Sequence, residues 1–132
     1  MYSVNELLPQ GESMIYIEDF YFKENVLISY PWFHRVTGRA SFLIPLSLCI
    51  ESACQSGEIL CRNMLKGLSL LYLVKIEDFV YLPMTKEEYR QITYKTTAAG
   101  ICGNYFKSVI CVNNSEKELF HFTCLHYFVS EA

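Results

Sequence analysis

PLSLCIESACQSGEILCRNM, residues 45–64, is the stretch that decides the fold class. Its apolar and small residues recur at steps of three and four, which predicts a helix that is apolar over most of its circumference and therefore buried. Pro45 suits the first helical turn, and Gly67 suits the stop. The spaced positions are Leu46, Ile50, Ala53, Cys54, Gly57, Leu60, Cys61 and Met64.

Strand-like segments lie on both sides of this helix. Before it, residues 13–22 and 26–30 flank the turn KEN and predict a hairpin. After it, aromatic-rich segments predict three or four long strands, with 68–82 as one strand or a bent pair and the others at 89–100, 104–112 and 117–129. One buried helix among five or six antiparallel strands predicts an α+β fold whose sheet wraps around the helix.

Length and composition exclude several classes of protein. The chain has 132 residues, which predicts a single domain over 1–132, and 52% of them are hydrophobic, which excludes overall disorder. The net charge of −3 and the lack of any Lys/Arg cluster argue against a nucleic-acid partner. No segment approaches the roughly 20 apolar residues of a membrane span, and the first residues do not resemble a secretion signal. We therefore expect a cytoplasmic protein with no membrane contact.

Metals and cofactors are not expected. The six cysteines form no CxxC pair and match no zinc module, so free buried thiols are the simpler interpretation. His121 and His126 are five residues apart on one predicted strand and so point to opposite faces, which argues against a shared metal site. We expect one of them to be half-buried and the other exposed. The sequence also contains no Walker loop and no dinucleotide fingerprint.

Glu51 and Gln55 stand out within the predicted helix. They are four residues apart and so share one face. A carboxylate in a mostly apolar helix costs free energy unless something compensates it, which makes Glu51 a candidate for proton transfer. On the pattern alone, a Glu51 that reaches solvent at an edge remains the alternative.

The segment ESACQSGEIL, residues 51–60, resembles the helix motif E-A-x-A-Q-x-x-G-I-L of the acyl-carrier-protein dehydratases that act on 3-hydroxyacyl thioesters. Residues 7–19, LLPQGESMIYIED, and 71–84, LYLVKIEDFVYLPM, resemble that family's opening and one of its strands. The resemblance extends over residues 7–129. It implies a hotdog fold, in which an antiparallel sheet wraps around one long central helix.

The resemblance also implies roles for residues of the helix. Glu51 matches the catalytic acid, which protonates the departing hydroxyl, and Gln55 matches the helix glutamine, here a positioning residue. Pro45 matches the proline that opens the helix, and the backbone N–H of Leu46 would polarise the thioester carbonyl. The family has a glycine at the position of Leu46.

The family's base is a histidine from an H-F-P-G loop of the other subunit, and this chain has no such motif. His34 lies seventeen residues before Glu51 and is the only histidine upstream of the helix. It is the candidate general base, and a packed loop histidine is the alternative. Arg35 and Arg39 lie on the same loop, where Arg39 is a candidate to contact phosphopantetheine or an acidic carrier protein. Ordinary solvated loop cations are the alternative.

Three functions follow from these observations. The first is dehydration, or the reverse hydration, of a 3-hydroxyacyl thioester in fatty-acid or related lipid or polyketide synthesis. The second is hydrolysis of an acyl thioester, and the third is a non-catalytic hotdog partner or acyl-binding subunit. The expected partners are an acyl-carrier protein or coenzyme A thioester. A homodimer, or a heterodimer with a related hotdog subunit, would cover the edge strand and apolar face that a lone hotdog leaves open.

Overall fold

A computed structural model describes residues 17–31, 46–81, 92–114 and 117–130 of the chain. In these ranges one long helix follows a strand hairpin and precedes four long strands, as the sequence predicts. The elements are β1 (Ile17–Lys23), β2 (Val26–Pro31), α2 (Leu46–Met64), β3 (Leu68–Tyr81), β4 (Thr93–Cys102), β5 (Tyr105–Asn113) and β6 (Glu118–Ser130).

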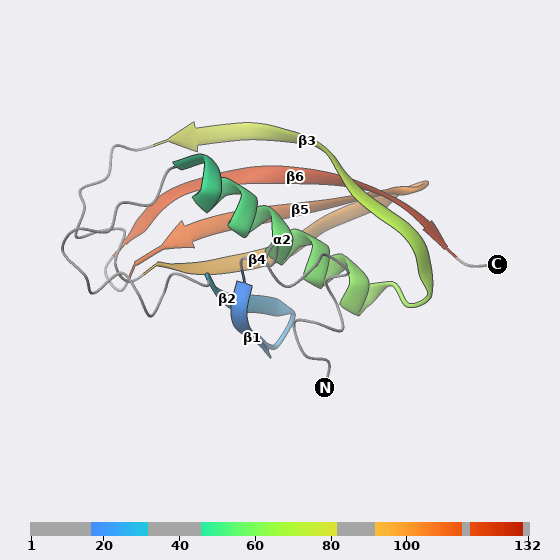
Figure 1. Cartoon of the computed structure of the whole chain (residues 1–132), viewed down its shortest axis with the longest axis horizontal. Helices are drawn as coiled ribbons and strands as arrows, with labels where there is room; N and C mark the ends of the chain where they lie inside the picture. The colour runs from blue at the N-terminus through green and yellow to red at the C-terminus, as the bar shows by residue number, and fades with distance from the viewer. Residues whose placement is uncertain (1–16, 32–45, 82–91, 115–116, 131–132) are drawn as a thin grey trace.

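The strands form one six-stranded sheet in the order β1-β2-β4-β5-β6-β3, and every neighbouring pair is antiparallel. The sheet curves around α2, which lies along its concave face (Figure 1). This arrangement confirms the predicted α+β fold. Because the hairpin β1–β2 occupies one edge, β3 is left at the other, with β6 as its neighbour in the sheet.

The segment after the helix folds as one strand and not as a separate pair. Gly67 has a φ of 67°, a left-handed conformation that glycine adopts without strain, and it separates α2 from β3. The pairing of β3 with β6 is irregular at three places, between Leu68 and Leu70, Leu73 and Lys75, and Glu77 and Val80. Such irregularities bend a strand, which lets fourteen residues stay paired along a curved sheet.

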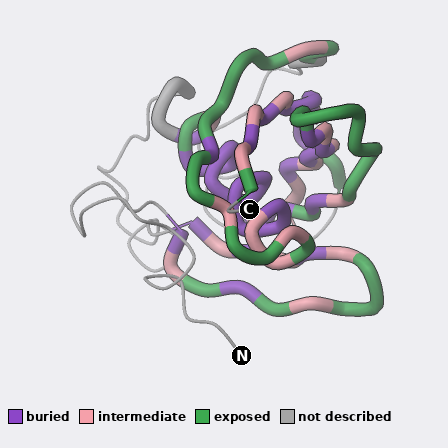
Figure 2. The backbone as a smooth tube through the Cα atoms, turned by 90° about the vertical axis from the view of Figure 1, so that its right-hand side faces the viewer, coloured by how far each residue is buried: buried purple, intermediate pink, exposed green. Residues whose placement is uncertain are grey.

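The core lies between the helix and the concave face of the sheet. On β5 the side chains of Phe106, Ser108, Ile110 and Val112 are buried in strict alternation, as expected for a strand with one face on the core. The helix is buried continuously from Ser52 to Cys61. Figure 2 shows these buried segments together inside the curl of the backbone. The predicted burial of the helix is therefore confirmed.

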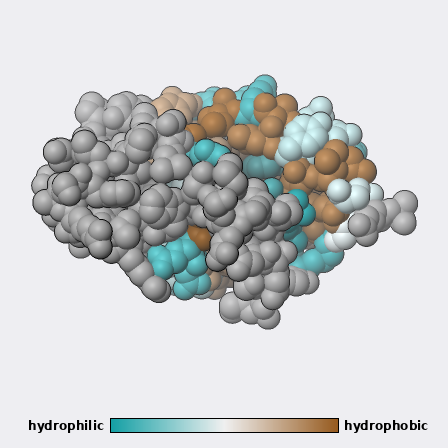
Figure 3. Space-filling model, viewed as in Figure 1, coloured by the Kyte–Doolittle hydropathy of each residue, from teal (hydrophilic) through white to brown (hydrophobic). Residues whose placement is uncertain are grey.

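Strand β3 exposes an unusual amount of apolar surface. It carries six of the ten large hydrophobic side chains that are exposed in the described part of the chain: Leu70, Tyr72, Leu73, Val74, Ile76 and Phe79. Figure 3 shows hydrophobic atoms gathered on the upper right of the molecule, over β3. We call this strand with its exposed side chains the β3 edge. Large apolar patches of this kind commonly mark interaction sites.

No helix in the described ranges is both long enough and apolar enough to cross a membrane.

Candidate functional site

A groove of about 280 Å³ runs between helix α2 and strands β3 and β6. We call it the α2–β3 groove. Its helical wall consists of residues spaced by three or four, which form a single stripe along α2. The lining residues are Glu51, Cys54, Gln55 and Glu58 of α2, Leu71, Tyr72 and Leu73 of β3, and His126 of β6.

The structure brings together two of the residues predicted from the sequence. Glu51 is exposed and Gln55 is only 6% exposed, and both line the groove. Their common face is therefore confirmed, and Glu51 reaches solvent in the single chain. Leu46 is the first residue of α2. Pro45, His34 and Arg39 lie outside the described residues, so their predicted roles stay predictions.

Glu58 is a groove residue that the sequence analysis missed. It is 7% exposed, and an oxygen of its carboxylate lies 3.9 Å from a guanidinium nitrogen of Arg62, one helical turn further along α2. The positive charge compensates a carboxylate that would otherwise be costly to bury. A signal was present, because Glu58 lies seven residues after Glu51, and that spacing returns to the same face of a helix.

His126 is the second groove residue that the sequence did not predict. His121 is half-buried as predicted, and its Nδ1 lies 3.1 Å from an oxygen of Glu118. The prediction that the other histidine is exposed is wrong, because His126 is 3% exposed. It alternates in phase with the side chains of β6 that are buried in the core: Phe120, Phe122, Cys124 and Phe128.

Burial and the nearby positive charge of Arg62 lower the pKa of His126 to about 4. The imidazole of His126 is therefore neutral at pH 7. Its Nδ1 is enclosed and has no hydrogen-bond partner among the described residues. The groove thus contains an exposed carboxylate, Glu51, near one end of the helical stripe and a neutral buried imidazole deeper along it.

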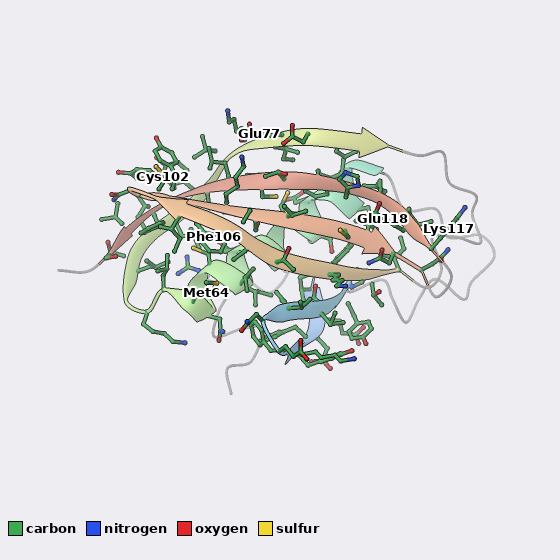
Figure 4. All side chains as sticks on the ribbon, turned by 180° about the vertical axis from the view of Figure 1, so that it is seen from behind. Met64, Glu77, Cys102, Phe106, Lys117 and Glu118 are labelled. Atoms are coloured by element: carbon green, nitrogen blue, oxygen red, sulfur yellow. The ribbon has the colours of Figure 1, made fainter. Side chains whose placement is uncertain are left out.

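Two of the thiols near the helix are held in their protonated form. All six cysteines are free, and four of them are buried as expected. The contact with Cys54, whose sulfur lies 3.5 Å away, and burial raise the pKa of Cys124. Burial raises the pKa of Cys49 to about 12. Cys102, at the tip of the β4–β5 hairpin (Figure 4), is exposed. No cluster of metal-ligating side chains occurs among the residues that the structure describes.

At Gly57, α2 packs closely against β5 and β6 beside the groove. A Cβ atom at this position would lie 2.9 Å from Ser108 Oγ and 3.1 Å from His126 Cε1. Both distances are shorter than ordinary contacts, so the side chains of Ser108 and His126, or the helix itself, would have to shift to admit a methyl group.

We therefore expect Gly57→Ala to lower the free energy of unfolding by about 1–3 kcal/mol, although alanine is the better helix former. Urea denaturation measures this change. Ser108→Gly removes the nearest atom and is the matched background, in which adding Gly57→Ala should cost less than in the wild type. If Gly57→Ala lowered the free energy of unfolding equally in the two backgrounds, the contact with Ser108 would not explain why position 57 needs glycine.

Comparison with solved structures identifies the fold. A thioesterase from Haemophilus influenzae is 16% identical, with a TM-score of 0.69 over 89% of this chain and 81% of that chain. A mutant thioesterase from Pseudomonas aeruginosa is 12% identical, with a TM-score of 0.69 over 89% and 84%. The dehydratase heterocomplex ApeI:P from Xenorhabdus doucetiae gives 12% identity and a TM-score of 0.72 over 99% of this chain and 93% of the matched chain.

These likenesses confirm the hotdog fold that the helix motif implies. Identities this low show the fold alone, because one fold hosts many chemistries. No protein-family model matches the sequence, and no curated protein matches it at a significant level.

Proposed function

We propose that this chain is a 3-hydroxyacyl-thioester dehydratase-like protein that acts on acyl-carrier-protein or coenzyme A thioesters in fatty-acid or related lipid or polyketide synthesis. The observation that carries the proposal is the position of Glu51 and Gln55. These two residues match the dehydratase helix motif, and together they line the groove beside β3. Hotdog structures of both a dehydratase complex and thioesterases are similar in fold. We also propose that residues 1–132 are one domain and that the protein is cytoplasmic.

The proposed reaction needs one base and one acid. The base, for which His34 is the candidate, takes the α-proton of the 3-hydroxyacyl thioester, and the electron pair forms the double bond. The bond from C3 to the hydroxyl oxygen breaks, and Glu51 gives this oxygen a proton, so that water leaves. Gln55 positions the substrate from the buried wall of the groove. Arg39, Pro45 and the N–H of Leu46 are assigned to binding the thioester and its carrier.

We propose that a second hotdog chain, either a copy or a related subunit, binds along the β3 edge. Within the described residues, β6 is the one strand paired with β3. The backbone N–H and C=O groups on the other side of β3 can therefore pair with a strand of another chain. Six of the exposed side chains of this strand are large and apolar, and Leu71, Tyr72 and Leu73 also form a wall of the groove. A chain bound there would cover both the apolar surface and the groove.

Replacing two side chains of the β3 edge should separate the chains. We expect Val74→Asp with Ile76→Asp to weaken association by at least about a hundredfold, because two carboxylates would be buried without partners. Sedimentation measures the mass as a function of concentration. Ile101→Asp, at an apolar residue on the β4–β5 hairpin that is at least as exposed, is the control and should leave association intact. Unchanged association of the double variant would place the interface elsewhere.

Two alternatives follow from the same fold. Two of the similar structures are thioesterases, and an acidic residue at the position of Glu51 would activate water in such a reaction. Another similar structure is a heterocomplex, which supports a non-catalytic partner or acyl-binding subunit as the third candidate. His34→Ala separates the first two functions, since it should abolish dehydration and leave hydrolysis largely intact.

The direct test is incubation with 3-hydroxyacyl and enoyl thioesters of pantetheine, coenzyme A and a carrier protein, with products identified by mass. Loss or gain of one water establishes the dehydratase. Release of the free acid moves the assignment to hydrolysis. No turnover of any substrate would reject the chain as a self-sufficient enzyme, and turnover restored by a related subunit would identify it as a partner.

A further inference from the structure

The α2–β3 groove continues well beyond Glu51. Glu58 is seven residues further along the helix, which corresponds to about 10 Å of groove at 1.5 Å per residue. His126 packs against Gly57, six residues and about 9 Å beyond Glu51. The imidazole therefore lies along the path that an acyl chain would follow, several carbons away from the atoms that react next to Glu51.

Three buried polar side chains line this deep part of the groove, and two have partners in the chain. Glu58 is paired with Arg62. Gln55 also has an interaction within the chain. His126 differs, because its Nδ1 is enclosed and has no hydrogen-bond partner among the described residues. Since His126 lines the groove and its Nδ1 is enclosed, Nε2 is the ring nitrogen left to meet a molecule bound there.

The ring of His126 offers that molecule a donor. It is neutral near pH 7, since burial and Arg62 hold its pKa at about 4, so one nitrogen carries a proton and the other a lone pair. A buried acceptor without a partner is tolerated better than a buried donor without one. The lone pair therefore belongs on the enclosed Nδ1, and the proton belongs on Nε2.

We propose that His126 Nε2–H donates a hydrogen bond to a second oxygen of the bound acyl chain, a hydroxyl or a carbonyl several carbons beyond C3. His126 is then a specificity-determining residue that selects oxygen-substituted acyl chains over saturated ones. A saturated chain would enclose the Nε2–H without an acceptor, which is the costly arrangement. The inference rests on the proposed function in one respect, namely that the groove holds an acyl chain with its reacting end at Glu51.

Unreactive ligands test this inference separately from turnover. We would use three 3-hydroxyacyl pantetheine amides of one chain length. The first is saturated beyond C3, the second carries a further hydroxyl and the third a further carbonyl. The extra oxygen in the second and third lies about 9 Å beyond C3. Titration calorimetry should show about ten- to hundredfold tighter binding of at least one oxygen-bearing amide. His126→Phe should remove this preference and bind the saturated amide at least as well. His121→Phe, on the opposite face of β6, should keep the preference.

A second measurement uses the wild-type protein and so does not depend on a variant that folds. Nitrogen-15 NMR of the imidazole should show the Nε2–H form of His126, with a shift of that nitrogen when the oxygen-bearing amide binds. Equal affinities for the three amides, no binding of any of them, a preference that survives His126→Phe, or an Nδ1–H form would each overturn the inference. Dehydration without this preference would overturn the inference alone, while the preference without turnover would overturn the dehydratase assignment alone.

Discussion

Glu51→Gln should lower kcat/KM for hydration of an enoyl thioester by about 10²–10⁴-fold, the usual contribution of a general acid or base. Glutamine keeps the size and polarity of the side chain but has no proton to exchange with the substrate oxygen. Because Glu51 is exposed on the helix, the variant should fold as the wild type does. Product mass, measured with coenzyme A and carrier-protein thioesters, gives the rate.

The matched control is Glu118→Gln, which makes the same change at an exposed residue where β6 begins (Figure 4). Glu118 bonds to His121 on the face of the strand away from the groove, so its replacement should leave the rate unchanged. A Glu51→Gln protein with the wild-type rate would remove Glu51 from the chemistry. Equal losses in both variants would point to a general effect of charge and not to a catalytic acid.

Acidification should destabilise the fold through His126. The folded state holds the pKa of this residue at about 4, whereas an unfolded histidine titrates near 6.5. Between these two values the unfolded chain binds more protons than the folded one, so stability falls as the pH decreases from about 6.5 to about 4. The contribution of His126 to this loss is about 3 kcal/mol, at 1.36 kcal/mol for each pH unit.

The measurement is urea denaturation at several pH values between 7 and 4. Carboxylates also titrate in this range, so the useful quantity is the free energy of unfolding of the wild type minus that of His126→Phe. This difference should fall by about 3 kcal/mol as the pH decreases from 7 to 4. His121→Phe should retain the decline of the wild type. A constant difference between the wild type and His126→Phe would mean that the folded protein accommodates the charged imidazole.

The sequence was sufficient for the fold because its signals are local. Spacing of three and four predicted a helix from Pro45, and the helix spans Leu46–Met64. The later strands were predicted within a few residues of their observed bounds, as for 117–129 against Glu118–Ser130. For the segment 68–82 the sequence left open whether it forms one strand or a bent pair. The register irregularities that bend β3 depend on its pairing with β6, some fifty residues further along the chain.

For the candidate site, the sequence predicted only those residues whose relative positions are determined by a single helix. Glu51 and Gln55 share a face because they are four residues apart, and Glu58 could have been added by the same rule. The position of His126 in the groove could not be predicted from local spacing. Its burial depends on which face of β6 meets α2 and on the close approach at Gly57. His34, Arg39 and Pro45 lie outside the described residues, so the choice of His34 as the base still rests on its being the only histidine upstream of the helix.

The position of β3 has a consequence for synthesis on the ribosome. Strand β3 is complete at residue 81, but its neighbour β6 begins only at residue 118, so the most apolar strand of the sheet emerges well before its partner. During this interval its side chains are open to wrong associations, and the pairing of strands that are far apart in the sequence is slow. Yield in a cell should therefore depend on chaperones that bind nascent chains, and slower translation of residues 82–117 would extend the period of risk.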